Sequence, residues 1–223
     1  MPHYDLSHPI ESDMCVYPDT PPVQIEPTAT VDTDGSQTTS IVMDSHAGTH
    51  IDAPAHMLVD GATIDELPVE TFQFTARLAD CRPLDPRMVI DIETITAALD
   101  GGIDGEVDLL VIQTGWDAHW GTGRYFDHPY LAVEAARWLA DRDLHVGIDA
   151  LNVDPTPTPN ATANEPTGYP VHHVLCSSDR LLVENLRGLC RLPPQFELHA
   201  YPLAVHGGDA APVRAVAVSG NNN

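Results

Sequence analysis

Short apolar segments bounded by turn residues constrain the fold of this chain more than any other feature of its sequence. Six of them are rich in Val, Ile and Leu and predict strands, at 38–43, 75–79, 109–113, 145–148, 197–203 and 213–218. Residues 92–99 and 131–142 show helical spacing, and residues 170–176 could open a short helical turn. Strands outnumber helices in a mixed order, which predicts an α/β fold with a mixed sheet and not a regular βαβ winding.

Charge is the most unusual part of the composition. The 223 residues include 33 acidic side chains and 10 basic ones, a formal charge of −23, and every basic residue is an arginine. Such a surface repels phosphates, so nucleic acid is excluded as the default partner. An acidic, lysine-free chain is typical of a protein adapted to molar salt, in which charges are screened over about 3 Å. No shift in composition divides the chain, so we expect one domain over residues 1–223.

Signals for location and redox state are few. No stretch approaches the roughly 20 apolar residues that cross a bilayer, and no secretory signal is visible, so we expect a cytoplasmic protein without a membrane partner. The four cysteines form no C-x-x-C pair and are expected to be reduced and structural. No glycine-rich phosphate loop or dinucleotide motif is present, so we expect no nucleotide cofactor.

The densest group of polar residues lies at 45–56. Its members with metal-binding side chains all fall at even positions: His46, His50, Asp52 and His56. In an extended chain they would project to one side, and a glycine and a proline within the segment would curl them around a common point. Imidazole and carboxylate are the ligands that zinc or manganese accepts. The alternative is a polar loop with capping histidines, but four such groups at this spacing favour a metal site.

A catalytic metal needs further ligands from elsewhere in the chain and keeps a position for water. The best candidates are His172–His173 and Glu184. Glu184 lies in an otherwise apolar segment, where a buried carboxylate would need a cation. Taken alone it is better interpreted as a surface residue, and it becomes a ligand candidate only beside the first cluster.

The pattern His46-x-Gly-Thr-His50-x-Asp52-Ala-Pro-x-His56 resembles the signature of the cyclase family of metal-dependent hydrolases, which includes bacterial kynurenine formamidase. The resemblance runs nearly from end to end. It continues at Val16-Tyr17-Pro18, Thr114-Gly115-Trp116, Gly147-Ile148-Asp149 with Asp154-Pro155, Pro170-Val171-His172, Glu184-Asn185-Leu186 and Asp209-Ala-Ala-Pro-Val-Arg214.

This resemblance implies a swivelling β/β/α domain, assembled as a homodimer or larger homo-oligomer, with a site for one or two metal ions. The residues that match the family's metal ligands are His46, His50, Asp52, His172 and Glu184. Asp52 and Glu184 are similar to carboxylates that can bridge to a second ion, and His172 fits the spacing better than His173. His56 resembles the family's catalytic acid/base.

Aromatic residues are candidates for substrate binding. The residue before the early proline is typically Trp in kynurenine formamidases and is Tyr17 here, which can still stack on a ring with a smaller face and an added hydroxyl. Trp116 is a second candidate, with packing in the core as the alternative. Residues 175–179 and the long loop at 154–170 also depart from the family pattern. These departures bear on the substrate and leave the metal ligands unchanged.

The resulting hypothesis is a metal-dependent amide hydrolase of tryptophan catabolism that converts N-formylkynurenine to kynurenine and formate. A divalent ion lowers the pKa of bound water towards about 7 and so supplies hydroxide, while His56 would carry a proton to the aniline nitrogen. Zn²⁺ is favoured, and Mn²⁺ also suits the ligands. The alternative substrates are cyclic amides such as isatin, or lactones. A metal-binding protein without catalysis is a third interpretation.

Overall fold

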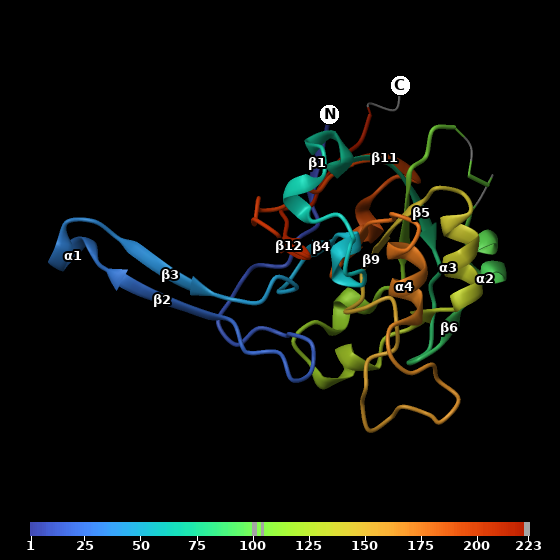
Figure 1. The fold of residues 1–223 in the computed structure, drawn as a ribbon, viewed down its shortest axis with the longest axis horizontal. Helices are drawn as coiled ribbons and strands as arrows, with labels where there is room; N and C mark the ends of the chain where they lie inside the picture. The colour runs from blue at the N-terminus through green and yellow to red at the C-terminus, as the bar shows by residue number, and fades with distance from the viewer. Residues whose placement is uncertain (100–101, 104, 221–223) are drawn as a thin grey trace.

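A computed structural model describes residues 1–99, 102–103 and 105–220. In this part of the chain, one mixed sheet of nine strands forms the body of the molecule (Figure 1). In order across the sheet these strands are β1 (His3–Asp5), β13 (Val216–Val218), β11 (Gln195–His199), β5 (Gln73–Asp80), β7 (Leu109–Gln113), β9 (His145–Ile148), β10 (Leu182–Glu184), β4 (His50–Asp52) and β12 (Ala210–Pro212). Neighbours from β5 to β10 run parallel, and the outer pairs are antiparallel. The predicted α/β fold with a mixed sheet is confirmed.

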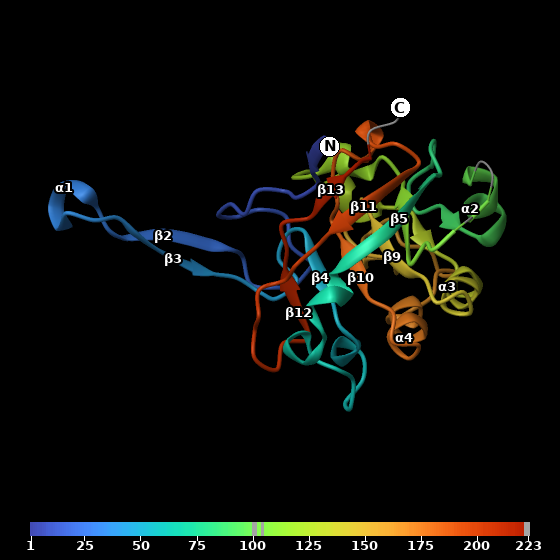
Figure 2. The same cartoon turned by 90° about the horizontal axis from the view of Figure 1, so that it is seen from above.

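Helices pack on one face of this sheet. They are α2 (Ile92–Ala98), α3 (Val133–Ala140) and α4 (Pro170–Cys176), which lie along the same flank in Figure 2. The uninterrupted apolar sequence of β7 follows from burial on both sides. Leu110 and Ile112 face the helices, whereas Leu109 and Val111 face a second core on the other side.

The second core shows that the sheet is curled. It joins Ile51 of β4 and Val183 of β10 to Phe74 of β5 and Leu198 of β11, although these strands lie in different halves of the strand order. Side chains from both halves can share one cluster only if the sheet bends around it. β10, β4 and β12 are hydrogen-bonded neighbours at one end of this curled sheet.

Element boundaries differ from the sequence prediction where a second pairing competes. The helix predicted from residue 131 begins at Val133, because Leu131 belongs to β8 (Tyr130–Leu131), which pairs with β6 (Val89–Ile90). β11 ends at His199, three residues before Pro202, and the predicted strand at 213–218 is reduced to β13. Short 3₁₀ turns lie at Pro54–His56, Ile64–Glu66, Val69–Phe72, Trp116–His119, Gly123–Asp127 and Leu189–Arg191.

A long arm projects from the body. It comprises β2 (Gln24–Ala29), the short helix α1 (Val31–Asp34) and β3 (Thr38–Val42), and β2 and β3 pair only with each other among the described strands. Figures 1 and 2 show the arm extending away from the nine-stranded sheet in both views. The segment predicted as a strand at 38–43 is therefore a strand of this arm, outside the main sheet.

The loop at 154–170 is held by Arg87. The Arg87 guanidinium pairs with the carboxylates of Glu165 and Asp127 and donates to the Thr158 hydroxyl at 3.2 Å. The loop ends at Tyr169, which is the N-cap residue of α4. Among the described residues, no helix has the length and apolar character needed to span a bilayer.

Candidate metal centre and active site

Two neighbouring strands supply the buried part of the site. β4 pairs antiparallel with β10 so that His50 lies directly opposite Glu184, and Asp52 lies opposite Leu182. Opposed residues of two strands point to the same face, so His50 and Glu184 are brought side by side. The side chains of His50, Asp52 and Glu184 are each at most 4% exposed.

His46 and His56 flank this pair from the turns on either side of β4. His46 follows the arm, and its backbone N–H donates to the Asp44 carboxylate at 3.0 Å. His56 ends the 3₁₀ turn that begins at Pro54, where proline suits the first helical position. The His46 and His56 ring centroids are 4.1 Å apart.

Asp52 is the centre of the cluster. Its Oδ1 lies 3.0 Å from His46 Nδ1 and 3.3 Å from His50 Nε2, and its Oδ2 lies 3.6 Å from His172 Nε2. Glu184 completes the ring, with oxygens 3.6 Å from His50 Nε2 and 3.5 Å from His172 Nε2. The structure therefore brings together all five residues proposed as ligands.

Several of these buried atoms lack a hydrogen-bond partner, which is the feature that best fits a cation. His50 Nε2 and both Asp52 oxygens are buried without a hydrogen bond, although they lie within 3.6 Å of one another or of another ring nitrogen. His50 Nδ1 is 2.9 Å from the Gly48 carbonyl, and an Nδ1–H donated there leaves Nε2 as a lone pair. Lone pairs of imidazole and carboxylate that face a common point repel one another unless a cation lies between them.

His172 is fixed by a carboxylate of its own. Asp154 Oδ2 lies 2.8 Å from His172 Nδ1 and also accepts the His172 backbone N–H, while Oδ1 accepts from Val171. A carboxylate on the far nitrogen is typical of metal-bound histidine, since it orients the ring. His173, the neighbouring candidate, is exposed to solvent.

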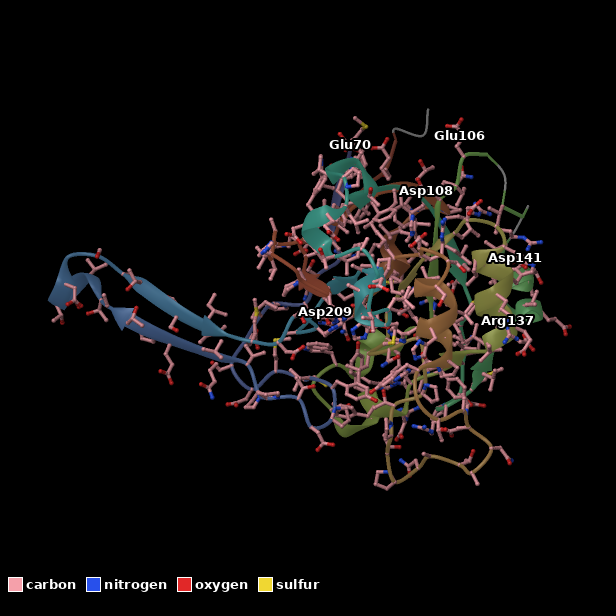
Figure 3. The ribbon with its side chains drawn as sticks, viewed as in Figure 1. Glu70, Glu106, Asp108, Arg137, Asp141 and Asp209 are labelled. Carbon is pink, nitrogen blue, oxygen red and sulfur yellow. The ribbon has the colours of Figure 1, made fainter. Side chains whose placement is uncertain are left out.

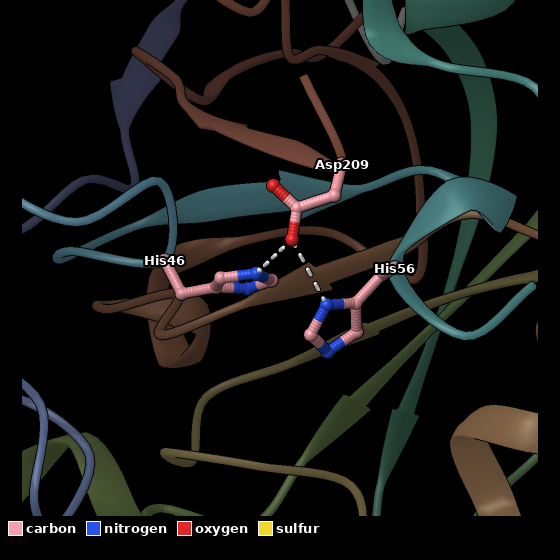
Figure 4. A group of neighbouring side chains, drawn as sticks. All are labelled: His46, His56 and Asp209. Atoms are coloured by element: carbon pink, nitrogen blue, oxygen red, sulfur yellow. Dashed lines mark hydrogen bonds and ion pairs between the residues drawn. The ribbon is translucent and has the colours of Figure 1, made fainter. Parts of the chain in front are cut away.

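Asp209 is a member of the site that the sequence did not single out. It lies directly before β12, which pairs with β4, and its Oδ2 is 3.0 Å from His46 Nε2 and 3.2 Å from His56 Nδ1 (Figure 4). Its Oδ1 accepts from the Ser45 hydroxyl at 3.1 Å. One carboxylate thus orients both a proposed ligand and the proposed acid/base. Its position within the closing segment 209–214 was visible in the sequence, but its contact with residues 46 and 56 was not.

The neighbouring carboxylates and burial together set the pKa of each histidine in the cluster. Burial alone would lower the pKa of His46, but Asp52 and Asp209 outweigh it and raise that pKa to about 10. Burial also opposes protonation of His172, yet the hydrogen bond to Asp154 and the nearby carboxylates of Asp52 and Glu184 hold its pKa well above the usual value. For His56 burial dominates and lowers the pKa, so the ring is neutral at pH 7. A bound cation would replace the protons on His46 and His172, because metal ligation requires the deprotonated ring.

A cavity of about 370 Å³ opens onto this cluster. It is lined by the four histidines and Glu184, and by Tyr17, Thr20, Asp44, Met57, Leu151, Asn152, Tyr169 and Asn185. The Tyr17 and Tyr169 rings lie 6.2 Å apart between centroids, and the Tyr169 hydroxyl donates to that of Tyr17 at 3.3 Å. The cavity therefore has a metal-binding floor and a wall with two aromatic rings.

Comparison with known proteins identifies the family. Residues 4–155 match the family described as "Putative cyclase", which is more than half of the chain. The chain belongs to the cyclase family. It is 34% identical over 220 residues to the kynurenine formamidase of Salinibacter ruber, covering 95% of each protein. It is also 30% identical over 225 residues to that of Bordetella avium, covering 96% of each.

Solved structures of cyclase-family proteins share the fold. The isatin hydrolase A of Labrenzia aggregata superposes with a TM-score of 0.87 at 24% identity, covering 98% of this chain and 93% of the other. A structure described as a potential metal-dependent hydrolase with cyclase activity has a TM-score of 0.75 at 32% identity, covering 97% and 96%. The mixed sheet and its curl therefore belong to a fold already seen in metal-dependent hydrolases.

Trp116, one of the two predicted substrate contacts of this cyclase-family protein, lies outside the cavity. Trp116 is 3% exposed, its indole N–H donates to the Arg124 carbonyl, and it packs in the core beside the helices. It is not among the residues that line this cavity, so its placement favours the alternative of core packing. Tyr169 takes the place opposite Tyr17, which sequence spacing could not indicate because 152 positions separate the two tyrosines.

Proposed function

We propose that this protein is an arylformamidase that hydrolyses N-formylkynurenine to kynurenine and formate. The observation that carries the proposal is the cluster of buried, unpartnered donor atoms beside His56, at the floor of a cavity with aromatic walls. Full-length similarity to proteins named kynurenine formamidases supports the choice of substrate.

The residues that would hold a divalent ion are His46, His50, Asp52, His172 and Glu184. When bound, such an ion polarises the carbonyl of the substrate and lowers the pKa of water. Zn²⁺ is the favoured ion, and Mn²⁺ also suits the mixed imidazole and carboxylate donors. Asp52 and Glu184 each lie close to two or more histidines, so the donor set has room to serve one ion or two.

His56 is the proposed acid/base. Its Nδ1 faces Asp209, which fixes the tautomer with the proton on Nδ1 and leaves Nε2 as the free nitrogen. Hydrolysis of the formamide places OH on the formyl carbon and H on the aniline nitrogen as the C–N bond breaks. His56 Nε2 takes a proton from the attacking water and returns it to that nitrogen, so its own charge is restored at the end of the cycle.

Tyr17 is the proposed substrate contact. Its ring lines the cavity and its hydroxyl is tied to Tyr169, so the ring is held in one orientation. An aryl ring stacked there would place the formamide towards the histidines, and offset stacking on tyrosine contributes about 0.5–1.5 kcal/mol.

Opening of a cyclic amide such as isatin, or of a lactone, is the alternative activity. It would use the same donors and the same acid/base, and only the cavity distinguishes the two substrates. We further propose that the enzyme acts in the cytoplasm, in molar salt, as a homo-oligomer.

The deciding experiment measures hydrolysis of N-formylkynurenine and of isatin side by side in molar salt, after loading with Zn²⁺ or Mn²⁺. We expect turnover of N-formylkynurenine that a chelator abolishes and the metal restores. His56→Ala should keep its metal content and lose most turnover, while the exposed His173→Ala serves as the matched control. Turnover of isatin alone would replace the formamidase assignment, and an inert but folded, metal-loaded protein would exclude both activities.

A further inference from the structure

The cavity that opens onto the metal centre carries one carboxylate that the proposed reaction does not use. Asp44 and Glu184 are the two acidic residues among those that line the cavity, and Glu184 belongs to the proposed ligand set. Asp44 is partly buried and lies two positions after the end of β3, directly before the turn that carries His46. Its negative charge is therefore available to a molecule bound in the cavity.

Asp44 uses one of its two carboxylate oxygens to hold this turn. Oδ1 accepts the backbone N–H of His46 at 3.0 Å, and the backbone carbonyl of Asp44 accepts from Ala47 at 3.1 Å. Within the described residues, Oδ2 has no hydrogen-bond partner. The bond to His46 fixes the carboxylate in place, and its second oxygen can accept from a cationic donor, for which hydrogen bonds to a carboxylate are strongest.

The cavity offers no comparable partner for a negative charge. No arginine occurs among the described residues that line it. Arg87 lines a second cavity, of about 220 Å³, and the hydrogen-bonded pair Tyr17 and Tyr169 lines both cavities and so lies between them. Arg87 is also already paired with Glu165 and Asp127. A carboxylate bound in the cavity at the metal centre would therefore find no arginine there.

The metal centre does not reverse this balance of charge. A divalent ion held there would be offset by the carboxylates of Asp52 and Glu184, and His56 is neutral at pH 7 because burial lowers its pKa. Outside the cavity, the formal charge of −23 favours the approach of cations and opposes that of anions. Both the cavity and the surface thus favour a ligand with a positive group.

We propose that Asp44 binds a positively charged group of the substrate, and that the enzyme prefers aryl formamides with a side-chain ammonium group and no carboxylate. The choice of an aryl formamide rests on the proposed function, whereas the preference for positive charge does not. N-formylkynurenine carries an ammonium and a carboxylate on the same carbon, so Asp44 would attract one and repel the other. The better substrate is the same molecule with its carboxylate replaced by hydrogen, which water converts to formate and a diamine.

Steady-state kinetics of the metal-loaded enzyme tests this preference with four formamides of one skeleton. They are N-formylkynurenine, the amine that lacks its carboxylate, the acid that lacks its ammonium group, and the neutral compound that lacks both. The value of kcat/KM for the amine should be about 10-fold above that for N-formylkynurenine, and the value for the acid about 10-fold below that for the neutral compound. Molar salt screens charges over about 3 Å, so contact within the cavity determines the ranking.

Asp44→Asn removes the charge and keeps an oxygen that can accept the His46 N–H. It should lower kcat/KM for the amine by about 10-fold, through KM, and change that for the neutral compound by less than about 2-fold. Asp19→Asn is the matched control. Asp19 is exposed, lies between Tyr17 and Thr20 without lining the cavity, and has a φ of 67°, which asparagine also tolerates. Its variant should keep the wild-type ranking of the four compounds.

Isothermal titration calorimetry with the four deformylated products gives a readout that does not require turnover. The diamine should bind the metal-loaded wild type about 10-fold more tightly than it binds Asp44→Asn, with metal content measured for each protein. Inert formamides with this difference in binding would remove the proposed function and leave the charge preference in place. Equal losses for the amine and the neutral compound in Asp44→Asn would overturn the role of Asp44, as would an acid that binds as well as the amine.

Discussion

Asp209 joins two histidines to which the proposed reaction gives different tasks. His46 presents Nδ1 to Asp52 and Nε2 to Asp209, while His56 presents Nδ1 to Asp209 and keeps Nε2 towards the cavity. The hydrogen bond from His46 is the main reason that the pKa of Asp209 is held well below its usual value. A permanent carboxylate at this point favours a proton on the nitrogen of each ring that faces it, so we regard Asp209 as a positioning residue.

Asp209→Asn should lower kcat by about 10- to 100-fold, because a neutral amide oxygen accepts from the two rings more weakly than a charged carboxylate and favours a proton on their facing nitrogens less. KM should change little, since Asp209 does not line the cavity. Asp209→Glu should recover part of the loss, and metal analysis separates weaker binding of the ion from slower proton transfer. An Asn variant with unchanged kcat would remove Asp209 from the mechanism.

His145 gives the fold a pH dependence away from the metal cluster. Burial, helped by Arg180, lowers its pKa to about 4, and its neutral Nδ1 accepts the Leu181 backbone N–H at 2.8 Å. The unfolded chain binds this proton near pH 6.5, so the contribution is complete above pH 6.5 and is lost as the pH falls towards 4. In that range it adds a slope of about 1.4 kcal/mol per pH unit to the free energy of unfolding.

Denaturant titrations at several pH values check this. His145→Gln should flatten the slope between pH 6.5 and 4 by about one proton, while the wild type loses stability more steeply. Parallel curves for the two proteins would show that His145 does not titrate on unfolding.

At this scale, local spacing was the informative part of the sequence. His46, His50, Asp52 and His56 could be grouped because they lie within one short segment, and the structure places them together. His172–His173 and Glu184 were candidates from their chemistry beside the first cluster, and the family resemblance selected His172 over His173. Asp209, Asp154 and Tyr169 were missed, since the contacts that give them a role cross 18 to 163 positions of sequence.

Strand prediction succeeded for elements with a strong apolar pattern. β7 and β9 were located because central strands of a parallel sheet are buried on both faces and read as apolar runs, whereas β5 alternates buried and exposed residues over much of its length. β1 and β4 have three residues each, too few for a periodic signal, and are strands only because of their neighbours in the sheet. The arm was half predicted: 38–43 was identified as a strand, but no local signal separates a free ribbon from the main sheet.

Val111 tests the energetic weight of the central strand. Val111→Ala should reduce the free energy of unfolding by about 2–3 kcal/mol, because two buried methyl groups are lost and a cavity remains. Val69→Ala is the matched control: Val69 is 59% exposed, so its variant should stay within about 0.5 kcal/mol of the wild type. Urea denaturation measures both, and equal losses would contradict a core centred on β7.

The whole molecule carries far more negative than positive charge, and its few cations are already engaged. Arg87 pairs with Glu165 and Asp127, and Arg214 pairs with Asp5. Of the acids labelled in Figure 3, Glu70, Glu106 and Asp141 are exposed, and they lie along the upper and right-hand sides of the body. This excess of negative charge could be predicted from the composition alone.

Salt should therefore stabilise the protein. Raising KCl from 0.1 M to 1 M shortens the screening length from about 10 Å to about 3 Å. We expect the melting temperature to rise by about 5 °C or more, which corresponds to about 2 kcal/mol for a chain of this length. Differential scanning calorimetry measures the shift, with sucrose as a control for solvent exclusion without screening. A melting temperature independent of KCl would refute adaptation to salt.

The order of the strands around the metal centre has a consequence for synthesis of the protein. β4 and β10 lie side by side although one carries residues 50–52 and the other residues 182–184, and Asp209 enters from the strand beyond β4. A nascent chain that has released β4 from the ribosome still lacks His172, Glu184 and Asp209. The complete donor set thus exists only after residue 209 has been synthesised, and a product stalled or cleaved before that residue cannot close the centre.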